Sequence, residues 1–439
     1  MPKRTLYILT TVLVLLIVGG LLGFYFIYLG GSEPTTDTTQ TSTDRADNDR
    51  GSGFGNTAGN NQQPSQIDIS STTTPTLDGA VPRLRKIYAG PTAGGISFER
   101  SRNEVVNGKT VKITETIIRY IERTKGSVYE TKTTDLNTER VSATLIPKIK
   151  EAFWNRDGNS LYIRYIPDGS ENIETYYGVI KPIKKTATSS LEIPSDINYA
   201  PQEIRGSFMA RNIQEIVPSS TKDSVFYLRL NNDKEQGILA RSDDTRRVEV
   251  FGSEITEWLA TFIKDPQIAL TTKASAAAPG FLYFLNTDTL RFDRILGNIM
   301  GLTTLVSPDL SSVLYSESDG GGRVTTNLHN IKTGVAEPFA LTTLPEKCVW
   351  SKRNLNLVYC AEPIFFPSTS YPDAWYQGTV SFADEIWSIN LKTGETALLA
   401  DPEKIVNEKI DLTRPFLSPK EDYLLFINKK DGSFWSLAL

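Results

Sequence analysis

The chain has one histidine, His329, and two cysteines, Cys348 and Cys360, among its 439 residues. A single imidazole excludes a zinc site built from several histidines and any mechanism in which two histidines act as acid and base. Two cysteines are too few for a disulfide framework or a four-thiolate metal site, although they can bridge to each other. No segment carries the regularly spaced acidic ligands of an EF-hand loop. We therefore expect no metal, no cofactor and no identifiable catalytic residue.

The chain also lacks an excess of basic residues. Lys and Arg total 47 against 51 Asp and Glu, a formal net charge of -4. Such a balance offers little to neutralise a phosphate backbone, so nucleic acid is excluded as a partner. The chain does hold 18 Tyr, 19 Phe and 6 Trp, bulky side chains that favour pleated, half-buried surfaces. This composition favours an all-β class.

Residues 6–29 form an uncharged apolar run, long enough as a helix to cross a hydrocarbon core of about 30 Å. Lys3 and Arg4 precede the run, whereas Glu33 and Asp37 follow it. The positive-inside bias then predicts a single-pass cell-membrane protein with a cytoplasmic N-terminus and an extracytoplasmic remainder. A cleavable signal peptide is the alternative, but its apolar region is shorter and ends in a small-residue cleavage site. Residues 1–31 are thus predicted to be a cytoplasmic tip and an uncleaved transmembrane helix.

Residues 32–80 consist almost wholly of Ser, Thr, Asn, Gln, Asp, Gly and Pro, with Phe54 as the one aromatic residue. Such a segment cannot bury enough apolar surface to offset the entropy of ordering. The sequence therefore predicts a disordered stalk over 32–80, followed by a folded domain over 81–439.

A weak repeat recurs in the domain: an apolar or aromatic anchor, a turn rich in Ser, Asn, Pro and Asp, and two strands, often followed by Lys-Thr-Gly. Successive anchors lie 63, 46, 43, 44 and 67 residues apart, close to the length of a four-stranded propeller blade with two insertions. Residues 95–131 supply one further unit, which brings the count to about seven. The anchors are Trp154, Val217, Ile263, Val306, Trp350 and Leu417.

The last repeat, from Leu417, contains inner strands but no outermost one. Residues 83–89, RLRKIYA, precede the first inner strand and stand where other units carry an outer strand. We therefore predict an all-β, seven-bladed β-propeller closed by this N-terminal strand, because closure removes exposed sheet edges. Six or eight blades remain alternatives, since several repeats lack a full S-P-D turn.

Several short motifs resemble the signatures of the TolB-like, WD-repeat-like propeller family. They are SPDLSSVLY from Ser307, LSPKEDYLLF from Leu417 and the two KTG turns at 332–334 and 392–394. The membrane-anchored layout also resembles that of bacterial envelope proteins. The resemblance implies a protein-interaction or envelope scaffold, and no catalytic residues come with it.

An inserted stretch over residues 362–378 concentrates aromatic side chains between prolines, and it is the best candidate for a binding site. Aromatic rings on a stiff loop can stack on sugars or hold a peptide at little conformational cost. The alternative is that the loop folds over one mouth of the ring and buries its rings as a satellite core. The candidate residues are Phe365, Phe366, Tyr371, Trp375 and Tyr376.

Cys348 and Cys360 are equidistant from Asn354, the centre of a predicted hairpin turn, and therefore fall opposite each other in the simplest antiparallel register. Outside the cytoplasm they can form a disulfide, although they can also stay reduced.

His329 aligns with Ile389 of the next repeat, which predicts a structural position on a strand. Residues 318–322 contain three glycines but no following Lys-Ser/Thr, so a hairpin tip is expected there, not a phosphate loop.

Two classes of function remain at this stage. The favoured one is a binding or scaffold module for envelope proteins or glycans, because a ring on a long tether offers interaction surfaces and little catalytic chemistry. The alternative is a carbohydrate-active enzyme that uses paired carboxylates at the propeller mouth.

Overall fold

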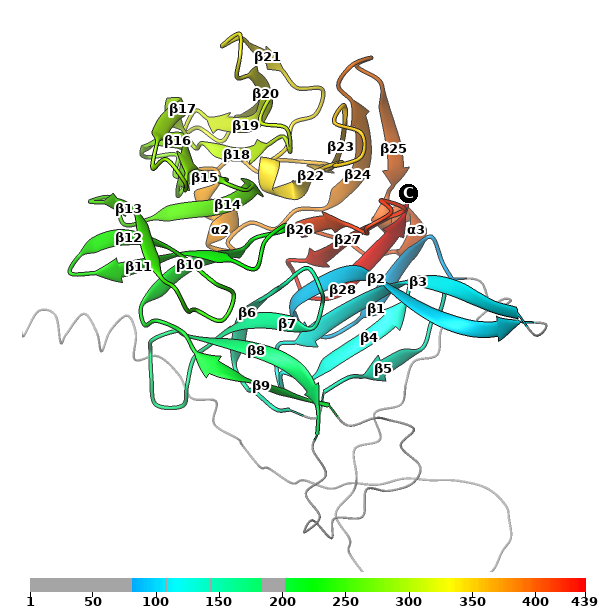
Figure 1. The fold of residues 1–439 in the computed structure, drawn as a ribbon. Helices are drawn as coiled ribbons and strands as arrows, with labels where there is room; N and C mark the ends of the chain where they lie inside the picture. The colour runs from blue at the N-terminus through cyan, green and yellow to red at the C-terminus, as the bar shows by residue number, and fades with distance from the viewer. Residues whose placement is uncertain (1–80, 107–108, 143, 184–201) are drawn as a thin grey trace, which may run out of the picture. The chain divides into compact units, whose positions relative to one another are not determined.

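Antiparallel sheets make up nearly all of the regular structure in the computed structural model, which describes residues 81–106, 109–142, 144–183 and 202–439. These residues form seven four-stranded sheets arranged radially as the blades of a propeller (Figure 1). The predicted transmembrane helix at 6–29 and the predicted stalk at 32–80 lie outside the described residues. Within the described ranges, no helix has the length and apolar character needed to cross a bilayer.

Six blades are built from four strands that are consecutive in the sequence, and they are numbered here from the N-terminus. Blade one contains β2 (Thr92–Val106), β3 (Lys109–Glu122), β4 (Val128–Lys132) and β5 (Thr138–Arg140). Blade two contains β6 (Ile149–Trp154), β7 (Ser160–Tyr165), β8 (Glu174–Pro182) and β9 (Gln202–Phe208). Blade three contains β10 (Ile213–Pro218), β11 (Val225–Asn231), β12 (Lys234–Ala240) and β13 (Val248–Ser253).

The next three blades repeat this order. Blade four contains β14 (Trp258–Lys264), β15 (Gln267–Thr272), β16 (Pro279–Asn286) and β17 (Phe292–Met300). Blade five contains β18 (Thr303–Val306), β19 (Ser312–Ser318), β20 (Val324–Asn330) and β21 (Ala336–Pro338). Blade six contains β22 (Cys348–Trp350), β23 (Leu357–Pro363), β24 (Asp384–Asn390) and β25 (Thr396–Ala400). Three short helices lie in connections: η1 (Pro345–Lys347), α2 (Asp373–Tyr376) and α3 (Pro402–Val406).

Blade seven joins the two ends of the domain. It contains β26 (Leu412–Leu417), β27 (Tyr423–Asn428) and β28 (Phe434–Ala438), and its outer strand is β1 (Leu84–Tyr88). Leu84 pairs with Leu437, and Lys86 pairs with Trp435. The seven-bladed count and the N-terminal closing strand are thus both confirmed.

The S-P-D repeat forms a turn that a side-chain hydroxyl holds in place. After β18, the Oγ of Ser307 accepts hydrogen bonds from the backbone amides of Ser311 at 3.1 Å and Ser312 at 2.9 Å. After β26, the Oγ of Ser418 accepts from the amides of Asp422 at 3.2 Å and Tyr423 at 3.0 Å. Such local side-chain bonds favour turns over continued strand, which explains why the motif marks the end of an inner strand.

The K-T-G repeat forms the turn between the third and fourth strands of a blade. The Oδ1 of Asn330 accepts from the amides of Lys332 and Thr333, and Asn390 makes the equivalent contacts in blade six. Gly334 closes the first of these turns with φ +72°, a conformation that side chains rarely adopt. The repeat therefore reflects turn geometry and carries no chemistry.

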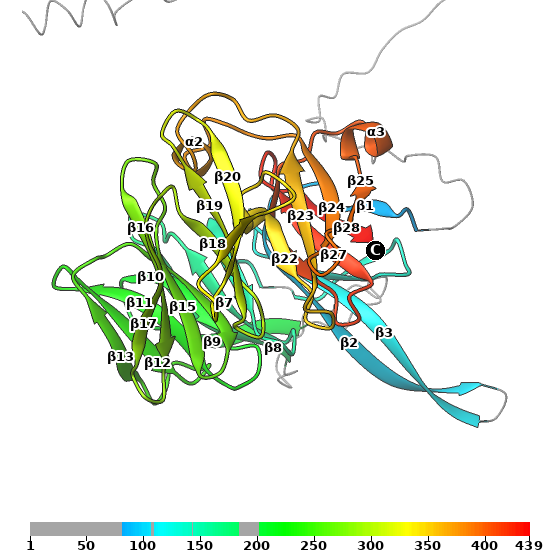
Figure 2. The ribbon, with the colours of Figure 1, turned by 90° about the horizontal axis from the view of Figure 1, so that it is seen from above.

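Blade one differs from the others because its first two strands extend beyond the sheet. β4 pairs only with residues Ile117 to Ile121 of β3, so the distal part of the β2–β3 hairpin pairs only with itself. This hairpin projects away from the ring as an arm (Figures 1 and 2).

Candidate functional site

Three adjoining hollows line the axis of the ring. The largest has a volume of about 600 Å³ and lies where the innermost strands end, which we call the strand-end mouth. Its lining includes Phe98 of blade one, Asp157 of blade two, Ser220 after β10, Trp350 of blade six and Glu421 of blade seven. Because blades on opposite sides of the ring contribute to one hollow, this hollow lies on the ring axis.

The second hollow, of about 440 Å³, forms the middle of the channel and is mainly apolar. It shares Ser97, Phe416 and Leu417 with the first hollow. The third, of about 420 Å³, shares Arg414 and Ile427 with the second. It lies where the innermost strands begin, which we call the strand-start mouth. The shared residues connect the three hollows in series along blades seven, one and two.

Two glycines let β2 of blade one pack closely against its neighbours, Gly94 against blade two and Gly95 against blade seven. A Cβ atom added to Gly94 would lie 2.1 Å from the carbonyl oxygen of Ala152, far inside a van der Waals contact. A Cβ added to Gly95 would lie 2.5 Å from the ring of Phe434. Backbone itself therefore forms part of the channel wall, and a larger residue at either position would displace a neighbouring strand.

Arg414 reaches across the channel from blade seven to blade two. Its Nη2 donates to the Oε2 of Glu151 at 2.7 Å, and its Nη1 donates to the carbonyl of Ala93 at 3.3 Å. The residue has φ +52°, and the strand register shifts between Thr413 and Phe416. A bulge of this kind redirects a side chain, and a non-glycine residue at positive φ is uncommon. The local backbone thus points a guanidinium into the channel at the border between the middle hollow and the strand-start mouth.

Two carboxyl groups of blade three have raised pKa values, so a substantial fraction of each stays protonated near pH 7. Burial, reinforced by the nearby Glu151, raises the pKa of Glu215 to about 7, although Arg164 and Arg414 oppose the shift. Burial alone raises the pKa of Glu235 to about 7. The Glu235 side chain is fully buried, and neither of its carboxylate oxygens has a hydrogen-bond partner among the described residues. A charged carboxylate without a partner is costly to bury, so Glu235 favours the protonated form.

The pKa of Glu235 predicts a pH-dependent stability. Its usual pKa of 4.5 applies to the unfolded chain and its raised value of about 7 to the folded chain. Between these values the folded state keeps a proton that the unfolded state has released, so stability falls as pH rises from about 4.5 to about 7. We expect Glu235→Leu to become progressively more stable than wild type over this window, by up to about 3 kcal/mol above pH 7.

Urea unfolding at a series of pH values measures this difference. Glu254→Leu, at an exposed residue, is the matched control and should follow the wild-type profile. A Glu235→Leu stability difference that stays constant from pH 4 to pH 8 would show that Glu235 does not titrate in this way.

A buried ion cluster closes the side of the strand-start mouth. The Nζ of Lys347 donates to Asp384 at 2.7 Å and to Asp411 at 2.6 Å, and all three side chains are fully buried. The indole of Trp375 donates to both oxygens of Asp411 at 3.1 Å. Burial raises the pKa of Asp384 to about 6, with Lys347 opposing the shift. The cluster links η1, α2, β24 and β26, and so fixes the aromatic loop to the ring.

The aromatic loop folds as a small core in which four of its five candidate rings are buried or partly buried. Tyr371 and Trp375 are buried, whereas Phe366 and Tyr376 are partly buried against the same cluster. The rings of Phe366, Tyr371 and Trp375 pack on Phe382, and Tyr376 packs on Trp375. Phe365, at 71% exposed, is the one candidate ring that faces solvent. Burial of apolar area favours this packed arrangement, which matches the alternative of a satellite core. A binding role for the loop stays a prediction.

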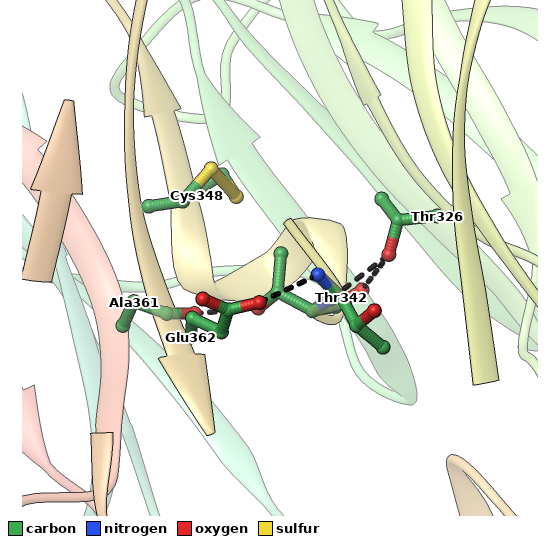
Figure 3. The surroundings of a disulfide bond; sticks show 7 residues. Thr326, Thr342, Cys348, Ala361 and Glu362 are labelled. Carbon is green, nitrogen blue, oxygen red and sulfur yellow. Dashed lines mark hydrogen bonds between the residues drawn. A yellow bond between two sulfur atoms is a disulfide. The ribbon is translucent and has the colours of Figure 1, made fainter. Parts of the chain in front are cut away.

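Cys348 and Cys360 lie directly opposite each other on β22 and β23, at the register that the sequence spacing predicts. Their sulfur atoms are 2.08 Å apart and bonded (Figure 3). Beside them the amide of Thr342 donates to the Oε1 of Glu362 at 2.8 Å. The bridge therefore joins β22, the inner strand of blade six, to the neighbouring strand β23.

The disulfide predicts a specific result from thiol chemistry. Native protein unfolded without reductant should show no reactive thiol, and reduction should release two. Because the bridge closes a short loop with a sequence separation of 12, its loss in a Cys348→Ser, Cys360→Ser variant should lower the free energy of unfolding by about 2–3 kcal/mol. Mass spectrometry that finds two free thiols in native material would overturn the assignment.

The two remaining sequence candidates lie in structural positions. His329 is on β20, where it pairs with Val313 and Ala336, and burial lowers its pKa. The glycine-rich segment after β19 forms a hairpin tip in which Gly320 and Gly322 have positive φ. Neither lines the three hollows described above.

Sequence reasoning missed the residues that define the channel. Glu151 and Arg414 are 263 positions apart, and only ring closure brings them together. The sequence offered one signal, the charged residue followed by proline, Arg414-Pro415, shortly before the Leu417 anchor. Lys347 carried no signal, since a lysine is normally exposed.

Comparison with known proteins adds information on the fold alone. No protein-family model matches the sequence, and no curated protein matches it. Among solved structures, the chain is similar to an oligogalacturonate lyase in complex with manganese, at 10% identity, with 80% of this chain and 98% of that chain covered and a TM-score of 0.42. It is also similar to TolB from Acinetobacter baumannii, at 10% identity, with 78% and 80% covered and a TM-score of 0.41.

The seven four-stranded sheets show a seven-bladed β-propeller fold. A puromycin-hydrolyzing peptidase of Mycobacterium tuberculosis is similar as well, at 11% identity, with 79% of this chain and 59% of that chain covered and a TM-score of 0.42. At such scores and identities the similarities carry no argument about a ligand or an activity. The propeller architecture stands on the seven sheets and the closing strand.

Proposed function

We propose that the chain is a membrane-tethered, extracytoplasmic binding module that holds an extended ligand in the axial channel of its propeller. The observation that carries this proposal is the series of three hollows joined by shared lining residues. Ligand sites are typically concave, with apolar walls and a few polar groups that fix orientation. The channel fits that description, since its middle is mainly apolar and both of its mouths carry charged side chains. The membrane anchor at 6–29 is part of the proposal, and the ligand is expected among envelope proteins or glycans.

The channel, not the aromatic loop, is the more suitable ligand surface. Phe416 and Leu417 of the seventh blade face Phe153 of the second around one hollow, and all three are partly exposed. Covering partly exposed apolar side chains in a concave wall with a ligand lowers the free energy of the complex, because apolar area is removed from water. The buried rings of the loop are already out of water, so a ligand would gain little by contacting them.

A channel-blocking substitution tests the proposed function. Ser97 lines both the first and the second hollow, so Ser97→Trp should fill the passage between them and weaken ligand binding at least about tenfold, by steric exclusion. Ser101→Trp is the matched control, because Ser101 lies on the same strand but on the projecting arm.

The measurement uses the full chain in detergent, screened first against peptide libraries and glycan arrays and then titrated with the selected ligand. Thermal unfolding of both variants checks that the ring is intact. Equal affinity for wild type and a folded Ser97→Trp variant would place the ligand outside the channel.

A further inference from the structure

The strand-start mouth is unusually basic. The hollow at this mouth is lined by one acidic residue, Asp431, and by five basic ones. The basic residues are Arg123, Lys150, Arg414, Lys429 and Lys430. The protein as a whole has a net charge of -4, so this concentration of positive charge runs against the overall balance.

Most of this charge is not neutralised within the described part of the chain. Arg123, Lys150 and Lys430 are exposed and form no ion pair with a described residue. Asp431 is committed to its own turn, where its Oδ1 accepts from the amide of Ser433 at 2.9 Å and from the Ser433 hydroxyl at 2.6 Å. A concave surface lined by one sign of charge focuses its field and attracts the opposite charge.

Lys429 is partly buried in the same mouth, and its polar partner is an uncharged carbonyl. Its Nζ donates to the carbonyl of Trp375 at 2.6 Å and lies 5.1 Å from the centroid of that indole ring. Burial lowers the pKa of Lys429, although Asp411 opposes the shift. An anionic group in the hollow would offset this loss of hydration, because an opposite charge favours the ammonium form.

The neighbouring middle hollow sets the other requirement on the ligand. Arg414 and Ile427 line both hollows, so a ligand in the basic mouth meets the apolar wall formed by Phe153, Phe416 and Leu417. A ligand with a carboxylate joined to apolar groups matches a basic mouth followed by an apolar hollow. A peptide that ends in, or near, an acidic residue supplies both parts, with its carboxylates toward the lysines and its apolar side chains in the channel.

We propose that the strand-start mouth binds the carboxylates of a peptide whose adjoining apolar residues occupy the middle hollow. This inference rests on the proposed function, since it names the ligand class for the same channel. It also assigns an orientation, with the acidic end of the peptide at the strand-start mouth.

The test is fluorescence anisotropy with the full chain and a defined probe. The probe is a fluorescein-labelled hexapeptide of leucine and phenylalanine that ends in two glutamates with a free C-terminus. Its matched partner ends in two glutamines and a C-terminal amide. We expect the acidic probe to bind at least about tenfold more tightly, and its affinity to fall as the salt concentration rises.

The variant that removes the charge is Lys150→Glu with Lys430→Glu, at two exposed positions where folding should be unaffected. It should lower the affinity for the acidic probe at least about tenfold and leave the affinity for the neutral probe unchanged. Lys332→Glu with Lys392→Glu makes the same change in net charge on two outer turns and should leave both probes unchanged.

The outcomes separate the two proposals. If Ser97→Trp abolishes binding of both probes but the two probes bind equally well, the channel binds peptide and the anionic site is wrong. If the outer-turn control lowers the affinity for the acidic probe as much as the mouth variant does, the effect comes from net charge. That result would also contradict the proposed anionic site. If neither probe binds but a polyuronate glycan does, and Ser97→Trp blocks it, the channel is a glycan site and the peptide inference fails.

Discussion

Replacing Lys347 with methionine is expected to lower the free energy of unfolding by about 3–5 kcal/mol. Lys347 is the cation between two buried carboxylates, Asp384 and Asp411, and its Nζ also donates to the carbonyl of Leu412 at 2.9 Å. Removing one partner of a buried ion pair is costly because the charges that remain have neither water nor a counter-ion. Methionine is similar in length and apolar, so the loss of packing is small compared with the loss of charge.

Denaturant unfolding at pH 7 measures this effect, and Lys234→Met is its matched control. Lys234 pairs with Glu254 on the surface, where both side chains are mostly exposed, so its replacement should leave the unfolding midpoint unchanged. A Lys347→Met midpoint equal to that of Lys234→Met would show that the buried cluster contributes nothing to stability.

The second large effect is expected at the closing strand. Leu84 of β1 is 3% exposed and packs among residues of blades six and seven, including Ile386 and Leu437. Leu84→Asp places an unpaired carboxylate in that core and removes the contact that seals the ring. We expect a loss of at least about 4 kcal/mol, which is a large fraction of the roughly 5–15 kcal/mol that stabilises an ordinary domain. Denaturant unfolding measures it. Leu145→Asp, at a residue that is 62% exposed, should cost little.

A covalent test separates ring closure from core packing in general. The amide of Ala438 donates to the carbonyl of Arg83 at 2.8 Å, so the two residues are neighbours across the seam. Cysteines introduced by Arg83→Cys and Ala438→Cys should form a disulfide under mild oxidation and raise the thermal midpoint. Failure of this pair to cross-link in native protein would mean that β1 does not close the ring.

The architecture could be predicted because it depends on local and repeated signals. The Ser307 and Ser418 turns follow from hydroxyl-to-amide bonds only four or five residues long, so short motifs mark them reliably. The place of β1 followed from counting strands, since an incomplete final blade needs an outer strand from elsewhere. These features give blade order and closure without knowledge of any side-chain contact.

The site could not be predicted in the same way. The channel wall forms only when blades from both ends of the chain meet, as Arg414 and Glu151 do, and such pairs leave no pattern in the sequence. The aromatic loop was ambiguous for a physical reason. Rings on a loop are equally compatible with ligand binding and with burial, and a partner for Trp375 such as the buried Asp411 is invisible from composition.

The structure of the full chain bound to the acidic hexapeptide, solved by crystallography or cryo-electron microscopy, tests the central claim most directly. We predict peptide density along the axis, with the carboxylates beside Lys150 and Lys430 and the apolar side chains against Phe416 and Leu417. Density on the projecting arm or on the outer face of a blade, with the three hollows empty, would contradict the account.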